Sequence, residues 1–180
     1  MIFRRQGLAA FEPIIIRGVD NMALADRVAV EIHEHNPDAV FIDAGGGQGV
    51  IDRLRQMGFQ VVEVPFGGKA NRPDLYANRR MEMWAECAAW LKSGGAIPAD
   101  PILQADLCAP TYGFTSAGLR ILESKDKLKE RIGRSPDLAD GLCLTFAAPV
   151  RPRLSPQMER LTGVGQTFDP MADFERQWRS

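Results

Sequence analysis

A short apolar run followed by a cluster of glycines constrains the fold of this 180-residue chain more than any other feature. Residues 39–43 have the length and apolar character of a buried strand, and residues 44–49 follow it with four glycines. A helix is expected over residues 50–57 with Gly58 just past its end, and a second strand over residues 60–64. This strand–helix–strand spacing predicts a right-handed parallel crossover and therefore an α/β domain.

The remaining patterns predict further helices and two hairpins. Leu24, Val28 and Ile32 recur at every fourth position, which indicates an amphipathic helix that Asp20 or Asn21 can cap. We expect strands over 2–6, 13–17, 111–114 and 119–122, and helices over 73–92, within 98–108, over 124–132 and over 135–147. Prolines recur from residue 149 onward, so the division expected is a domain of residues 1–148 and a tail of residues 149–180 with a small helix near Phe174.

Composition and charge exclude several classes of protein. Hydrophobic residues make up 45% and charged residues 25%, and the formal net charge is −1, so no global basic field indicates nucleic acid. No apolar stretch approaches the length of a membrane span, and residues 1–5 are not followed by the apolar region of a signal peptide. Cys87, Cys108 and Cys143 form no CxxC pair, which indicates reduced thiols in a cytosolic protein.

Two groups of acids could carry chemistry. Asp43 ends the expected buried strand, where open α/β sheets place their ligands. Asp137 and Asp140 are three residues apart at the start of the last helix, so they share one face near the positive end of the helix dipole. Acids from distant segments can together hold Mg²⁺, and two such ions can clamp a phosphodiester. We treat all three acids as candidate catalytic residues, with Asp43 and Asp137 as candidate metal ligands.

The glycine cluster leaves other interpretations open. Asp43 and the glycines form an Asp-x-Gly-x-Gly-x-Gly pattern that resembles the nucleotide-binding loop of S-adenosylmethionine-dependent methyltransferases. Such folds need an acid at the end of the following strand to hold the ribose hydroxyls. Here Glu63 lies in mid-strand and the strand ends in apolar residues. A plain turn with a helix-capping Asp43 is a third interpretation, and a capping acid beside a solvated one would equally explain Asp137 and Asp140.

Several basic residues could contact a phosphate backbone, which dominates the affinity of proteins for DNA. The candidates are Lys69, Arg79, Arg80, Lys125 and Arg134. Solvated helix faces are the alternative for them, and core packing is the favoured interpretation of Trp84 and Trp90 beside the two arginines. His33 and His35 would end the first helix, where a cation complements the dipole. A metal role is not expected for them, because no cysteine or further histidine shares their spacing.

Residues 2–148 resemble the C-terminal nuclease domain of phage terminase large subunits. Each matching segment is short, and the resemblance rests on their joint order and spacing. The segments are 39–49 (AVFIDAGGGQG), 66–70 (FGGKA), 76–84 (YANRRMEMW), 95–98 (GAIP), 122–125 (LESK) and 135–142 (SPDLADGL).

The resemblance implies an RNase H-like α/β fold, a mixed sheet flanked by helices, in a motor that packages viral DNA. It implies three carboxylates that bind Mg²⁺ or Mn²⁺. Asp43 matches the acid at the end of the fourth strand and Asp137 the acid at the start of the last helix, with Asp140 a close second. Double-stranded DNA, the ATPase half, the small terminase subunit and the portal are the implied partners. The implied reaction is hydrolysis of concatemeric DNA by an activated water in the host cytoplasm, leaving a 3′-hydroxyl.

The chain departs from the family's pattern at its start. The family's first strand, with its acid, precedes the segment that matches residues 2–5, and no G-x-x-x-x-G-K-[ST] motif of the ATPase half occurs. We therefore expect the central strand between residues 2–6 and 39–43 to be missing, and the two-metal site to be incomplete. The hypothesis is a truncated nuclease that is inactive by itself. A prophage remnant, or a module that binds DNA or a portal without cutting, stays open as an alternative.

Overall fold

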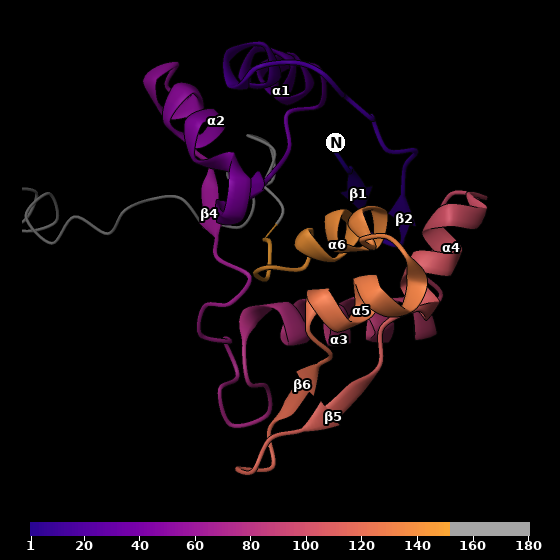
Figure 1. The fold of residues 1–180 in the computed structure, drawn as a ribbon. Helices are drawn as coiled ribbons and strands as arrows, with labels where there is room; N and C mark the ends of the chain where they lie inside the picture. Colours follow the sequence, from indigo (N-terminus) through magenta and orange to yellow (C-terminus); the bar gives the residue numbers. More distant parts are fainter. Residues whose placement is uncertain (152–180) are drawn as a thin grey trace, which may run out of the picture. The chain divides into compact units, whose positions relative to one another are not determined.

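A pair of parallel strands lies between two layers of helices (Figure 1). Strand β3 (Phe41–Asp43) pairs with β4 (Val62–Val64), with Asp43 opposite Val64, and helix α2 (Ala44–Gln56) connects them. The parallel crossover predicted from the sequence is confirmed. Successive side chains of a strand point to opposite faces, so Ile42 packs into one layer while Phe41 packs into the other. Asp43 therefore shares the face of Phe41.

The computed structural model describes residues 1–151, and Met1–Val150 form one unit within it. The small helix expected near Phe174, and nearly all of the tail, lie outside the described residues. The described part contains six helices, none of them long and apolar enough to cross a membrane.

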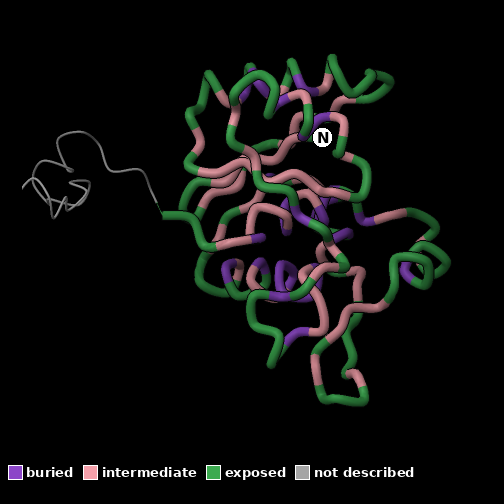
Figure 2. The backbone as a smooth tube through the Cα atoms, turned by 90° about the vertical axis from the view of Figure 1, so that its left-hand side faces the viewer, coloured by how far each residue is buried: buried purple, intermediate pink, exposed green. Residues whose placement is uncertain are grey.

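Each layer has its own apolar core. On one side, helix α1 (Asn21–His35) contributes Ala25 and Ala29, which pack against Val50 and Leu54 of α2. On the other side lie α3 (Arg79–Lys92), α4 (Pro101–Cys108) and α6 (Asp137–Leu144). Their buried residues, together with Val64 and Ala147, are Met83, Trp84, Cys87, Leu103, Leu138, Ala139, Leu142 and Cys143. In Figure 2 the buried residues gather where helices face the interior of the domain.

The strands outside the parallel pair are shorter than expected. The first hairpin consists of β1 (Arg5–Gln6) and β2 (Ala9–Ala10), extended by a single bridge between Ile2 and Ile14, and residues 13–17 form no continuous strand. The second consists of β5 (Tyr112–Phe114) and β6 (Arg120–Leu122), which projects from the helices (Figure 1). Within residues 1–151 the strands form three separate two-stranded sheets and no continuous mixed sheet.

Two helices begin later than the sequence predicts. Helix α3 starts at Arg79 because Asn78 adopts an extended backbone and its side chain accepts the amide of Met81. Helix α6 starts at Asp137, one residue after Pro136, which serves as the N-cap and supplies no capping side chain. The short charged helix α5 (Lys125–Ile132) begins as expected, capped by Ser124.

The glycine cluster is helical, which corrects the expectation of a loop over residues 44–49. Helix α2 begins at Ala44, directly after Asp43, whose side chain caps it by accepting the amide of Gly45. A methyl group built on Gly47 would lie 2.6 Å from Cγ2 of Ile42, and one on Gly49 would lie 2.5 Å from Nδ2 of Asn21. Gly47 therefore lets α2 approach the strand closely, whereas a methyl group on Gly49 would meet the end of an exposed side chain that can move.

Two adjacent glycines of α2 provide a matched test of this packing. A methyl group on Gly46 would meet nothing within 4 Å, whereas one on Gly47 would meet the stiff, β-branched side chain of Ile42. We expect Gly46→Ala to stabilise the fold by about 0.5–1 kcal/mol, because alanine loses less backbone entropy in a helix. Gly47→Ala should destabilise it by about 1–3 kcal/mol through overpacking. Urea unfolding measures both values, and equal effects would contradict the packing explanation.

Candidate functional site

A buried carboxylate, that of Asp140, joins three helices at the centre of the candidate site. Its Oδ1 accepts a hydrogen bond from Trp84 Nε1 at 2.9 Å and from Arg80 Nε at 3.2 Å, both on α3. Lys125 Nζ, from α5, lies 3.1 Å from Oδ2. Asp140 is 6% exposed and Arg80 is 7% exposed, so both members of the ion pair are shielded from solvent. The carboxylate is thus engaged by internal donors.

Asp137 lies one turn earlier on α6 and is exposed. Asp106 of α4, an acid that no sequence pattern singles out, lies near it with only 1% of its surface exposed. The pKa of Asp106 is raised above its ordinary value, chiefly because the carboxyl group is buried, and the charge of Asp137 raises it further. The ion pair and hydrogen bond with Arg134, and a hydrogen bond from the amide of Leu138, act in the opposite direction. Asp106 thus places a buried carboxyl group near the start of α6.

Asp43 is half-buried at the end of β3. Its Oδ1 accepts the amide of Gly45 at 2.9 Å, which fixes the carboxylate at the start of α2. The neighbouring side chain on the same face of the strand, Phe41, packs against the core that includes Leu138 and Ala139 of α6. The strand that ends in Asp43 and the helix that begins with Asp137 are therefore packed together.

The basic candidates divide into buried and exposed residues. Arg80 is buried and bonded to Asp140 and to the carbonyl of Glu123 at 3.3 Å, which leaves no surface for a phosphate. Arg79 is half-buried, and its Nη1 donates to the carbonyl of Ala147 at 3.0 Å.

Lys69, Lys125 and Arg134 are exposed. Two of them also have internal partners, because Lys125 pairs with Asp140 and Arg134 pairs with Asp106. Trp84 and Trp90 are each 8% exposed, which confirms their interpretation as core residues.

An ion pair and hydrogen bonds of Glu123 connect the base of the β5–β6 hairpin to helix α5. Glu123 accepts hydrogen bonds from Arg131 of α5 at 2.7 Å and from the hydroxyl and the amide of Thr111. These donors lower the pKa of Glu123 to about 2. The carboxylate therefore stays ionised in all ordinary buffers and ties the hairpin to α5, beside Lys125.

Among residues 1–151, Asp43, Asp137 and Asp140 belong to no group of three potential metal ligands whose binding atoms lie within 4.8 Å of one another. One such group does occur in this part of the chain, at the end of α1, and it consists of Glu31, Glu34 and His35. The structure therefore brings Asp43 and Asp137 onto packed elements without completing a three-carboxylate cluster around them.

The buried ion pair between Asp140 and Arg80 can be tested by its effect on stability. Asp140→Leu should destabilise the fold by about 3–5 kcal/mol, because it leaves the guanidinium of Arg80 buried and unpaired. Adding Arg80→Met should recover much of that loss, because a well-packed apolar pair can replace a buried ion pair. Urea unfolding of the two single variants and the double variant gives the coupling energy. Simple additivity of the two single effects would show that the pair does not interact.

As a control, Asp137→Asn should change the unfolding free energy by no more than about 0.5 kcal/mol, because its side chain is exposed. A loss as large as that of Asp140→Leu would show that both acids of α6 are structural.

Comparison with known proteins finds likeness at the level of structure. No family model matches the chain, and no curated protein sequence matches it significantly. The nuclease domain of the large terminase subunit gp2 of bacterial virus Sf6 superposes with a TM-score of 0.67 at 19% identity, over 82% of this chain and 81% of that one. A mutant of that domain with manganese gives 0.63 at 21% identity, over 82% of each chain.

A second phage enzyme extends the comparison. The large terminase nuclease from thermophilic phage G20c superposes with a TM-score of 0.54 at 16% identity, over 73% of this chain and 64% of that one. The resemblance inferred from short sequence segments is thus matched by the backbone. The chain has the fold of the nuclease domains of phage large terminase subunits.

Proposed function

We propose that this chain is the nuclease part of a large terminase subunit, which cuts double-stranded concatemeric DNA with divalent metal ions during genome packaging. The observation that carries the proposal is the likeness of fold, over 82% of the chain, to domains named as terminase nucleases, one of them with manganese. The chain would act in the host cytoplasm beside an ATPase half, a small subunit and a portal.

Asp43 and Asp137 are the metal ligands in this proposal. Both offer carboxylate oxygens, the donors that Mg²⁺ and Mn²⁺ prefer. The hydrogen bond from the amide of Gly45 orients the carboxylate of Asp43. The packing of Phe41 against the core that includes α6 supports a position of Asp43 close to Asp137. When bound, the ions would supply an activated water and neutralise charge on the phosphodiester.

Asp140 has a positioning role rather than a ligand role in this proposal. Its Oδ1 accepts hydrogen bonds from Arg80 and Trp84, and its Oδ2 forms an ion pair with Lys125, so a metal ion on this carboxylate would compete with donors already in place. By holding α6 against α3 and α5, Asp140 keeps Asp137 at the exposed start of its helix.

A third carboxylate would come from outside residues 1–151, because no such residue completes the group around Asp43 and Asp137 in this part of the chain. We propose that a further strand, carrying that acid, fits between β1 and β3. Strands β1 and β3 belong to different two-stranded sheets, which a strand in this position would bridge. The metal site formed by residues 1–151 alone is then partial.

Contacts to the DNA backbone are assigned to exposed cations. Lys69, Lys125 and Arg134 are exposed, and Arg79 is half-buried next to Ala147. Arg80 is excluded by its burial. The methyltransferase alternative has no support, because the glycines that would form its nucleotide loop lie within α2, where Gly47 packs on Ile42 and Gly49 on Asn21.

The metal assignment is tested by Mn²⁺ binding, followed by water-proton relaxation in titrations of the purified chain. Asp43→Asn and Asp137→Asn should each weaken binding by about tenfold or more, because each removes one anionic ligand. Asp52→Asn, an exposed acid on α2, is the matched control and should leave binding unchanged. Equal binding by all four proteins would refute the assignment.

Plasmid cleavage with Mg²⁺ or Mn²⁺ tests whether the site is partial. We expect little or no cutting by this chain, because two carboxylates hold two ions poorly. Robust cutting that Asp43→Ala abolishes would confirm the nuclease and show that no further acid is needed.

A further inference from the structure

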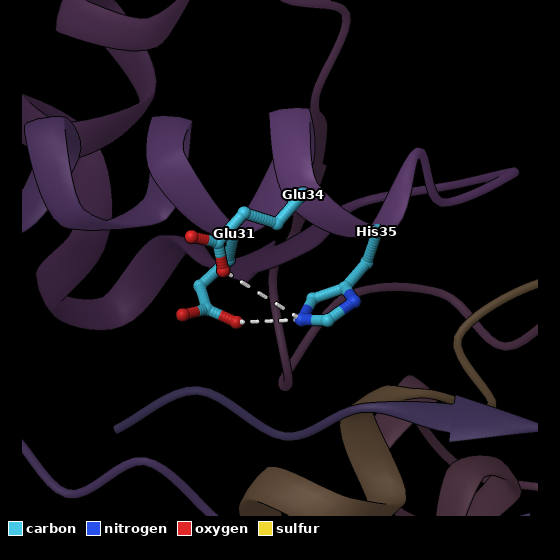
Figure 3. A group of neighbouring side chains, drawn as sticks. All are labelled: Glu31, Glu34 and His35. Atoms are coloured by element: carbon cyan, nitrogen blue, oxygen red, sulfur yellow. Dashed lines mark ion pairs between the residues drawn. The ribbon is translucent and has the colours of Figure 1, made fainter.

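A cluster of three potential ligands lies at the C-terminal end of α1, on the helix layer opposite α3 and α6 (Figure 3). Glu31, Glu34 and His35 follow the i, i+3, i+4 spacing that brings side chains together on one side of a helix. His35 Nε2 lies 3.4 Å from Oε2 of Glu31 and 4.0 Å from Oε2 of Glu34. All three ligand atoms lie within 4.8 Å of one another.

The buried member of the cluster has an unsatisfied oxygen. Glu31 is 6% exposed, and its Oε1 accepts a hydrogen bond from Arg27 at 2.6 Å. Its Oε2 is buried and has no hydrogen-bond partner, since Arg4 Nε, at 3.8 Å, is too distant for one. A buried anionic oxygen without a donor is costly, so this atom gains from a cation placed beside it.

The imidazole presents a lone pair to the same position. Arg4 Nη1 lies 2.6 Å from His35 Nε2, and a guanidinium can only donate hydrogen bonds. Nε2 therefore receives this contact with its lone pair, the same electron pair with which an imidazole binds a metal. The ligand atoms of all three residues lie within 4.8 Å of one another, and Arg4 is the cation that now lies against two of them, Glu31 and His35.

We propose that Glu31, Glu34 and His35 form a binding site for a late first-row transition ion such as Zn²⁺, with Arg4 as the competing cation that the metal displaces. Two ligands about 2.1 Å from a tetrahedral ion lie roughly 3.4 Å apart, which matches the separation of Glu31 and His35. Oε2 of Glu34 lies farther from His35 Nε2, at 4.0 Å, and Glu34 is exposed, so a change of side-chain rotamer can bring it closer.

The ligand set also selects the metal. One imidazole nitrogen with two carboxylate oxygens suits Zn²⁺, Ni²⁺ or Cu²⁺, whereas Mg²⁺ prefers oxygen ligands alone. The site therefore takes a different class of ion from the one proposed for Asp43 and Asp137, and it does not depend on that proposal. The proposal differs from the expectation that His35 has no metal role, which rested on the absence of cysteines and further histidines at that spacing, because two glutamates lie on the same helix face.

The composition of the chain makes the test unusually specific, because it has only two histidines, His33 and His35. The experiment is a Zn²⁺ titration of the tag-free chain, read by the imidazole ¹⁵N resonances and by competition with a chromophoric chelator. A Cys108→Ser background removes the exposed thiol as a rival ligand. We expect the His35 Nε2 resonance to shift while the resonances of His33 stay in place.

Variants then separate this site from casual surface binding. His35→Asn and Glu34→Gln should each weaken Zn²⁺ binding by about tenfold or more, since each removes a ligand. Both side chains are exposed, so the fold should survive, and urea unfolding checks this. His33→Asn is the matched control and should bind as the parent does. Arg4→Gln should bind more tightly, because the competing cation is gone.

Lowering the pH should release the metal, because the imidazole must be neutral to bind. The proposal is overturned if His35→Asn binds Zn²⁺ as well as the parent, if His33→Asn weakens binding equally, or if Arg4→Gln fails to strengthen it. Each of these results can be read without any cleavage assay.

Discussion

The buried ionic contact between Asp140 and Arg80 is the constraint on which the rest of the candidate site depends. It joins α6 to α3 in a region nearly closed to solvent. Trp84 donates to the same carboxylate oxygen as Arg80, and Lys125 forms an ion pair with the other oxygen. A buried ion pair of this kind gives little net stability compared with apolar packing, but it is costly to break from one side. Its effect is to fix which face of α6 is buried, and this leaves Asp137 exposed.

The same contact explains why sequence reasoning located the acids but not their separate roles. Asp137 and Asp140 are equivalent in the sequence, since both fall in the first turns of a helix. What separates them is a partner 60 positions away, because Arg80 meets Asp140 and not Asp137. Local spacing carries no information about such a partner. For the same reason Arg80 resembled a DNA contact in the sequence and is buried in the structure.

The fold itself was predictable where the determining contacts are local. The apolar run at 39–43 predicted the parallel crossover correctly, and the spacing of apolar residues predicted helix α1 correctly. Both predictions depend only on residues that are close in the sequence. The glycine cluster was misassigned as a loop, because the close contact of Gly47 with Ile42 depends on how α2 packs on β3 and is not visible in the local pattern. Asp106 was overlooked because its burial against Arg134 depends on how α4 packs.

The two proposed cation sites differ in their chemistry. In the proposed function, the carboxylates at the end of β3 and the start of α6 would hold hard ions beside a phosphate substrate. The mixed nitrogen and oxygen donors at the end of α1 suit softer ions and lie next to a displaceable arginine.

The most direct measurement of the central claim is the anomalous scattering of Mn²⁺ in crystals of this chain. We predict an anomalous peak that contacts the carboxylates of both Asp43 and Asp137, while Asp140 keeps its bonds to Arg80 and Trp84. A peak bound to Asp140, or the absence of any Mn²⁺ peak at Asp43 and Asp137 under saturating metal, would contradict the account.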